Sequence, residues 1–284
     1  MIKKVLFVVF CCNLVNGKLR KCSENFEEPE ICTLDPKYDK MKPPQNETPL
    51  PIFSSLTLNS IDRVNENGQS ITFNVLLAIF WNDSRLSLKN GQGSRVIGSD
   101  MQPNLFIPRM KILKTRKVEN IKLLGSGQSD ITIIFGFDGR NYHDHYLEYQ
   151  QNLKLTLYCP FEFQEYPFDD NYCDFDYGPA SQFSDAIQMK SVLLRHNGNF
   201  KNAIGDYLKW RNSRLPFEFQ MEIKKPFNHQ EAGFNYSYTG IRIKLRRKER
   251  QTLLLQFYFP TLIFALTAFI SYFINPDIVS FIFT

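Results

Sequence analysis

Of the six cysteines in this 284-residue chain, the four that lie beyond its N-terminal apolar segment could cross-link it. Cys22 and Cys32 lie close together near the N-terminus, and Cys159 and Cys173 form a second closely spaced pair. In an oxidising compartment an even number of thiols forms disulfides, and the short spacings favour bridges 22–32 and 159–173. A loop of the 159–173 length stabilises a fold by about 3 kcal/mol when it is closed.

Asparagine side chains offer a second kind of covalent chemistry. Asn-x-Ser/Thr triplets begin at Asn46, Asn82 and Asn235, and such triplets accept N-linked glycans in exported proteins. They support export, although triplets of this kind also arise by chance.

Catalytic and metal-binding patterns are missing from the sequence. It contains no His-Glu-x-x-His, no Gly-x-Ser-x-Gly and no phosphate-binding loop. His143-Asp144-His145 follows an Asp138-Gly139 turn without further clustered ligands, so we predict a solvated hairpin there and not a metal site. We therefore expect no enzyme activity, no metal and no cofactor. The net charge of +5 is mild, and no basic run interleaved with aromatics indicates a nucleic-acid partner.

The N-terminal segment is typical of a secretory signal. Lys3 and Lys4 precede the mostly apolar stretch Val5–Val15, and Val15-Asn16-Gly17 is a usable cleavage site. We predict a signal peptide at residues 1–17, which would also remove Cys11 and Cys12. A buried N-terminal strand or helix is the alternative.

An uncharged apolar run from Leu253 to Ile274 exceeds the roughly 20 residues that cross a bilayer. We predict a transmembrane helix at residues 251–274 and the start of a linker at 275–284; a buried helix of a soluble protein is the alternative. The basic residues before this run would be cytoplasmic by the positive-inside rule. A cleaved signal instead commits the long N-terminal region to the outside, and we expect the signal to decide.

The region between these segments alternates apolar and polar residues as strands do. Apolar side chains occupy every second position in residues 71–81, 153–157 and 241–245. Asn67-Gly68 is a turn signal between strand-like stretches. The fold class predicted is mainly β: an extracellular β-sandwich over residues 18–250, followed by one transmembrane α-helix.

The segment from Cys159 to Cys173 resembles the signature loop of Cys-loop receptors, the pentameric ligand-gated ion channels, in its Cys-Pro start and its Tyr166-Pro167-Phe168-Asp169 centre. Trp81 to Leu86 resembles the family's Trp-x-Asp-x-Arg-Leu motif, and Tyr38-Asp39-Lys40 resembles its N-terminal entry. Residues 256–275 resemble the first transmembrane helix of its anion-type (GABA-, glycine- and glutamate-gated) members. The matches follow the family's order from about residue 38 to 277.

The resemblance implies a ligand-binding sandwich in a homo- or hetero-pentamer at the plasma membrane, with a synaptic location as one expectation. A small neurotransmitter would bind between sibling subunits under aromatic rings, whose faces attract a cationic amine. On this sequence the implied ligand-binding candidates are Phe106, Tyr177, Tyr236, Tyr238 and Asn152.

The resemblance also implies that the signature loop rests on the membrane domain. Pro167, Phe168 and Asp169 would then couple ligand binding to the pore, and the basic stretch around Arg247 and Lys248 would face acidic residues of neighbouring loops.

Several positions depart from the family pattern. Phe106-Ile107-Pro108-Arg109 replaces Trp-x-Pro-Asp, and the arginines that hold a ligand carboxylate in amino-acid receptors correspond to Ala78 and Asn152. No second cysteine pair lies near residues 225–245. No pore helix follows the first span, so we expect a fragment of a channel subunit or a short subunit that acts in assembly. The alternative function is a single-pass adhesion receptor, which would favour a long Cys…Trp…Cys bridge.

Overall fold

The computed structural model of this chain describes residues 20–21, 31–34, 37–44, 49–88, 95–97, 101–120, 131–135, 145–181, 183–196, 199–211 and 214–273. Several predicted features lie outside the described residues: the signal peptide at 1–17, Cys22, Asn46, the Asp138-Gly139 turn, and residues 275–284.

The larger sheet has eight strands in the order β13–β12–β3–β4–β10–β9–β6, with β8 paired to β10. Its bounds are β3 (Leu50–Asn65), β4 (Ser70–Asn82), β6 (Arg95–Ile97), β8 (Thr115–Asn120), β9 (Ile131–Phe135), β10 (His145–Tyr158), β12 (Ile187–His196) and β13 (Asn199–Lys201).

The second sheet has six strands in the order β14–β15–β17–β11–β7, with β16 paired to β17. Its bounds are β7 (Met110–Ile112), β11 (Asp170–Pro179), β14 (Tyr207–Arg211), β15 (Phe217–Ile223), β16 (Phe227–Glu231) and β17 (Phe234–Arg247). A small sheet joins β1 (Arg20–Lys21), β2 (Ile31–Thr33) and β5 (Leu86–Leu88), and a 3-10 turn, η1, covers Gln102–Asn104.

The two main sheets enclose one apolar core, because their inward positions alternate as the sequence predicts. The apolar residues at every second position of 71–81, 153–157 and 241–245 are all buried. Phe73 of β4 meets Phe175 of β11 edge-on, with ring centroids 5.6 Å apart, so the two sheets interlock. The predicted β-sandwich is confirmed.

The predicted turn at Asn67-Gly68 joins β3 to β4 through residues 66–69. The Gly68 amide donates to the Asn65 side chain at 2.9 Å, and a Cβ on Gly68 would lie 2.5 Å from the Asn65 amide nitrogen. A side chain at this position would displace the Asn65 side chain from its hydrogen bond. The turn carries Glu66 to the end of the sandwich nearest the helix.

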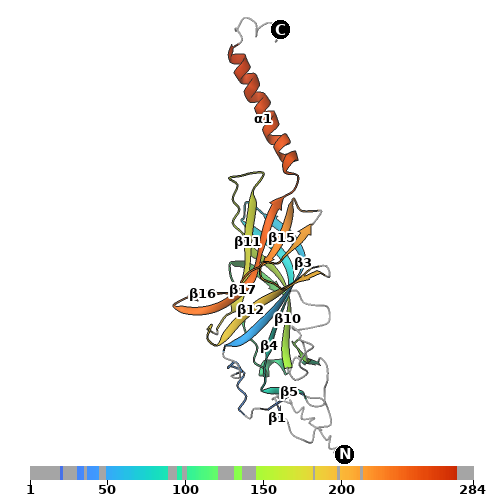
Figure 1. Ribbon diagram of the computed structural model, residues 1–284, viewed down its shortest axis with the longest axis vertical. Helices are drawn as coiled ribbons and strands as arrows, with labels where there is room; N and C mark the ends of the chain where they lie inside the picture. The colour runs from blue at the N-terminus through green and yellow to red at the C-terminus, as the bar shows by residue number, and fades with distance from the viewer. Residues whose placement is uncertain are drawn as a thin grey trace, which may run out of the picture.

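Helix α1 (Arg250–Phe273) extends from one end of the sandwich, β1 and β5 lie at the opposite end, and β16 projects from the side (Figure 1). Among the described residues it is the one helix long and apolar enough to cross a membrane. Its side chains from Leu254 onward are exposed in the protomer. Exposed apolar side chains along a whole helix are expected where lipid or neighbouring helices cover it.

Candidate functional site

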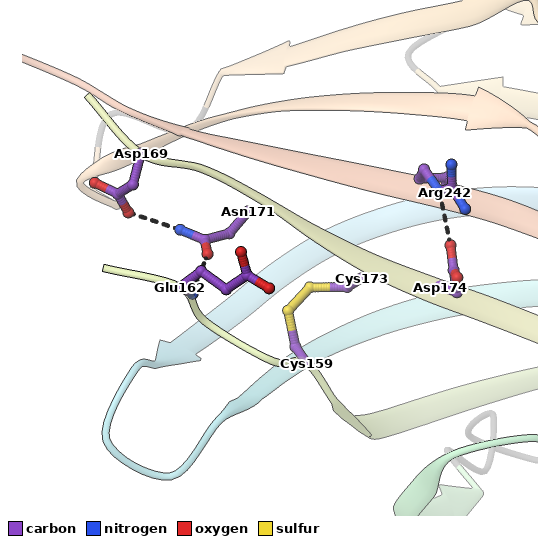
Figure 2. The surroundings of a disulfide bond; sticks show 7 residues. All are labelled: Cys159, Glu162, Asp169, Asn171, Cys173, Asp174 and Arg242. Atoms are coloured by element: carbon purple, nitrogen blue, oxygen red, sulfur yellow. Dashed lines mark hydrogen bonds and ion pairs between the residues drawn. A yellow bond between two sulfur atoms is a disulfide. The ribbon is translucent and has the colours of Figure 1, made fainter. Parts of the chain in front are cut away.

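A disulfide joins Cys159, just after β10, to Cys173 in β11, with the two Cα atoms 4.9 Å apart (Figure 2). The loop that it closes is braced from within. The Asn171 side chain donates to an Asp169 oxygen at 2.7 Å and accepts the Glu162 main-chain amide at 2.7 Å. These bonds fix the direction of the Asp169 carboxylate, whose side chain is buried.

Arg247, the last residue of β17, meets this loop at a buried ion-pair site. Its Nε donates to Asp169 Oδ1 at 2.7 Å, and its Nη1 donates to Glu66 Oε1 at 3.1 Å. The guanidinium carbon also lies 4.7 Å from the ring centroid of Tyr166 and 5.1 Å from that of Phe217. Burial alone would lower the pKa of Arg247, but the hydrogen bonds to Glu66 and Asp169 raise it above its usual value. The side chain therefore stays charged.

Asp170, the first residue of β11, is the acidic centre of a neighbouring group of cations. It accepts bonds from Lys244 at 2.8 Å, from Arg246 at 3.2 Å and from Arg250 at 2.8 Å. Arg250 begins α1, so this carboxylate connects the sheet to the helix. Lys248 donates at 2.8 Å to a main-chain carbonyl oxygen just before β15.

The disulfide loop also touches the helix directly. The Tyr258 hydroxyl of α1 donates to the Tyr166 carbonyl oxygen at 3.1 Å. The Arg250 guanidinium lies 6.0 Å from the exposed ring of Phe168, whereas Pro167 is buried within the loop. The structure thus brings the five predicted coupling residues to the junction between sandwich and helix. Their role in gating stays a prediction.

A second candidate site is an exposed cluster of aromatic rings beside the β16–β17 hairpin. Phe183, just after β11, stacks on Phe234 with centroids 4.6 Å apart and approaches Tyr236 at 5.6 Å. The Ser184 amide donates to the Asn235 carbonyl oxygen at 2.8 Å, which holds the two segments together. Phe183 and Phe234 are 39% and 51% exposed, so their rings are available to a ligand.

Two lysines attach the hairpin to the sandwich. Lys111 of β7 pairs with Glu231 at the tip of β16 across 2.6 Å. Lys224, just before β16, pairs with Asp176 of β11 at 2.6 Å and lies 5.0 Å from the ring centroid of Phe227. Ion pairs therefore attach β16 and the segment before it to β7 and β11, in addition to the main-chain hydrogen bonds between β16 and β17.

The ligand-binding candidates predicted from the sequence lie in different environments. Tyr177 is fully buried, and its hydroxyl donates to Ser54 at 2.7 Å; burial raises the pKa of this phenol. Phe106 is buried as well, and Asn152 lies on β10 in the other sheet. Tyr236 alone among these candidates belongs to the exposed ring cluster.

Tyr238 is buried in this chain, two positions along β17 from Tyr236, and its ring lies 6.0 Å from that of Phe227.

Of the predicted glycosylation sites, Asn82 ends β4 and Asn235 is exposed on the hairpin. Cys32 is disulfide-bonded, and its pairing with Cys22 stays a prediction because Cys22 lies outside the described residues.

Sequence reasoning did not find several residues of these two sites. Phe183 and Phe234 carry no motif, although Phe234 directly follows the Ala232-Gly233 turn. Glu66 precedes the recognised Asn67-Gly68 turn, but its partner Arg247 lies 181 positions away, so no local signal pointed to it. Asp170 and Arg250 border residues that were predicted, but their pairing depends on strand register.

Comparison with known proteins adds the family. Residues 28–249 match the family model described as the neurotransmitter-gated ion-channel ligand binding domain. The chain is 23% identical over 257 residues to the glycine receptor subunit beta of Rattus norvegicus, covering 84% of the chain and 46% of that protein. It is 19% identical over 263 residues to the gamma-aminobutyric acid receptor subunit rho-1 of Mus musculus, covering 90% of the chain and 51% of that protein.

The chain thus spans about half the length of the curated relatives it matches. The matched region covers both main sheets, the disulfide loop and the aromatic hairpin, and it ends one residue before α1. The resemblance noted in the sequence is confirmed: this chain belongs to the neurotransmitter-gated ion-channel ligand-binding domain family, with the disulfide loop of a Cys-loop receptor subunit similar to those of glycine and GABA receptors.

Proposed function

We propose that this chain is a subunit of a ligand-gated, anion-type ion channel and contributes its extracellular domain and first membrane span. The proposed division is a signal peptide at 1–17, a ligand-binding domain at 18–250, a membrane helix at 251–274 and the start of a linker at 275–284. The subunit would assemble with siblings into a pentamer at the plasma membrane. Support comes from the family match and from helix α1, which follows the sandwich directly.

A small amine-bearing neurotransmitter is the proposed ligand. The exposed rings of Phe183 and Phe234 and the half-buried ring of Tyr236 form a cluster that suits a cationic amine, because ring faces carry negative charge. The cluster lies beside the protruding β16–β17 hairpin, where a neighbouring subunit could close over it. The relatives named above are receptors for glycine and for gamma-aminobutyric acid, and both ligands carry an amine.

The observation that carries the proposal is the path of strand β17. It begins at Phe234 in the aromatic cluster and ends at Arg247 in the buried ion-pair site, three residues before α1. A continuous strand of this length spans about 45 Å at roughly 3.3 Å per residue. A ligand that prefers one position of the hairpin would therefore bias the position of Arg247 and of the helix, which is a two-state coupling between separate sites.

The test is electrical recording from cells that express the complete reading frame containing these 284 residues. Glycine, gamma-aminobutyric acid and monoamines are applied in turn, and we expect one of them to evoke a current that reverses at the chloride equilibrium potential. Tyr236→Ala should raise the half-maximal agonist concentration, whereas Tyr207→Ala, which changes an exposed tyrosine away from the ring cluster, should not.

A receptor that reaches the surface as a pentamer but gives no current with any of these ligands would contradict the proposed ligand class. A current that reverses at the cation potential would contradict the anion type. Surface protein that stays monomeric and adheres to other cells would favour the single-pass adhesion receptor.

A further inference from the structure

A cavity of about 780 Å³ is lined by residues of β4, of β10 and of the 102–110 segment. Strands β4 and β10 contribute to one side of it, and residues 102–110 form another. Its apolar lining includes Leu77, Ile79, Leu105, Phe106, Ile107 and Met110. Lys40, Met41, Arg109 and Ser181 also line it and are exposed, so the cavity opens to solvent on that side. Its volume is within the range typical of small-molecule sites.

The walls of the cavity are held by a hydrogen-bonded network built from two recognised sequence motifs. Asp83 pairs with Arg85 at 2.7 Å, and Arg85 donates to the Asp39 carbonyl oxygen at 3.2 Å. The Phe106 amide donates to the Tyr38 hydroxyl at 2.8 Å, and the same oxygen donates to Asp83 at 3.3 Å. The network ties the segments at 37–44 and 102–110 to the end of β4, so the cavity is preformed.

Two cations, Arg109 and Lys40, border this cavity. Arg109 makes no ion pair with any residue that the structure describes, while its carbonyl oxygen accepts the Ala180 amide at 2.8 Å and fixes its main chain. Lys40 donates to the neutral carbonyl oxygen of Pro103 at 2.9 Å. Neither aspartate nor glutamate is present among the described lining residues. An apolar space favours an anionic head on an apolar body when two positive charges at its mouth have no ion pair within the described part of the chain.

We propose that this cavity binds a small monocarboxylate with an apolar body, and that Arg109 anchors the carboxylate. Arg109 occupies the position where the family pattern has an acid, so the sequence departs from its relatives at this site. Its planar guanidinium can hold both carboxylate oxygens, which a lysine cannot do. Lys40 supplies the second charge, and the apolar lining takes the body of the ligand.

This site is independent of the proposed transmitter site. Phe183, Phe234 and Tyr236 do not line the cavity. We therefore expect the chain to bind this ligand whether or not the transmitter site is functional. Failure of the channel experiment would leave this inference standing, and the reverse also holds.

The test is isothermal titration calorimetry on the full chain, purified in a non-ionic maltoside detergent. The probe is 3-phenylpropionate, and its uncharged amide is the matched ligand. We expect the carboxylate to bind at least about tenfold more tightly than the amide, because a charge-assisted hydrogen bond is stronger than a neutral one. Arg109→Gln should weaken carboxylate binding about tenfold or more and leave amide binding unchanged.

Two further variants control for charge and for folding. Arg63→Gln removes an exposed positive charge from β3 outside the cavity and should leave both affinities unchanged. Ser181→Trp adds a bulky ring at the exposed mouth and should abolish binding of both ligands. The proposal is overturned if the carboxylate does not bind at millimolar concentration, if the amide binds equally well, or if Arg109→Gln and Arg63→Gln behave alike.

Discussion

Arg247 and Asp169 are 78 positions apart in the sequence, yet their side chains form a hydrogen-bonded ion pair with 2.7 Å between Nε and Oδ1. The side chains of Arg247 and Asp169 are only 7% and 3% exposed, respectively. One residue belongs to the disulfide loop and the other ends the strand that leads into α1. The pair therefore joins the loop to the membrane helix at a point from which water is largely excluded.

Removing the charge of Arg247 should destabilise the chain strongly. Arg247→Gln leaves the buried carboxylate of Asp169 without its cation, and breaking a buried pair in this way costs on the order of 3 kcal/mol. The measurement is the free energy of unfolding in urea at pH 7. Arg246→Gln, which changes the neighbouring exposed arginine, should cost less than about 1 kcal/mol. Equal losses in the two variants would contradict the importance of the buried pair.

Opening the disulfide loop should prevent export. Cys159→Ser leaves Cys173 unpaired. Because the open chain has more conformational freedom when unfolded, the fold should lose roughly 3 kcal/mol of stability. We expect little or no chain at the cell surface, measured by antibody labelling of intact cells. The double variant Cys159→Ser/Cys173→Ser has no free thiol, but its loop is still open, so it should lose the same stability. Normal surface levels of the double variant would show that the fold does not need the bridge.

Tyr177 should behave as a core residue in this chain. Tyr177→Phe removes only the hydroxyl that donates to Ser54, so it should cost about 1 kcal/mol of unfolding free energy. Tyr177→Ala leaves a large cavity between the sheets and should cost about 3 kcal/mol or more. Tyr207→Phe, at an exposed tyrosine, is the control and should change stability by less than about 0.5 kcal/mol. A stable Tyr177→Ala variant with altered agonist response would instead support a direct ligand contact.

The aromatic cluster should determine agonist potency without affecting assembly. Phe183→Ala removes a ring that contacts both Phe234 and Tyr236, and a lost cation–π contact of about 1 kcal/mol corresponds to roughly fivefold lower affinity. The dose–response curve of the complete receptor should shift to higher agonist concentration at unchanged surface level. Phe53→Ala, at another exposed phenylalanine, should leave the curve in place. If both variants shift it equally, the cluster is not the ligand site.

Asp170 should make the free energy of unfolding depend on pH in the acidic range. Although desolvation raises its pKa, the hydrogen bonds from Arg246, Lys244 and Arg250 lower the pKa well below its ordinary value of 3.8. A carboxylate with a lowered folded-state pKa contributes stability above the unfolded-state value and loses it as pH falls through and below 3.8. Unfolding free energies measured from pH 7 to pH 3 should therefore fall less steeply for Asp170→Asn than for the original chain.

The control for this pH dependence is Asp185→Asn. Asp185 is exposed and makes no ion pair within the described part of the chain. Its variant should reproduce the original pH profile. Parallel profiles for Asp170→Asn and the original chain would exclude Asp170 as the source of the acid sensitivity.

Local patterns in the sequence determined the architecture. Alternating apolar residues predicted the buried faces of β4, β10 and β17, because a strand turns every second side chain to the same side. The content of the loop between Cys159 and Cys173 indicated the family, and the uncharged run predicted α1. Each of these signals lies within one short segment, so it can be read without knowledge of the fold.

Tertiary structure alone decided which residues meet. The pairing of Arg247 with Asp169 and Glu66 depends on the register of β11 against β17 and on the position of the β3–β4 turn. The burial of Tyr177 and the stacking of Phe183 on Phe234 depend equally on contacts between distant segments. A shift of one residue in a strand turns its side chains to the opposite face. The sequence therefore predicted the strands, whereas long-range packing determined which aromatic and charged side chains form the sites.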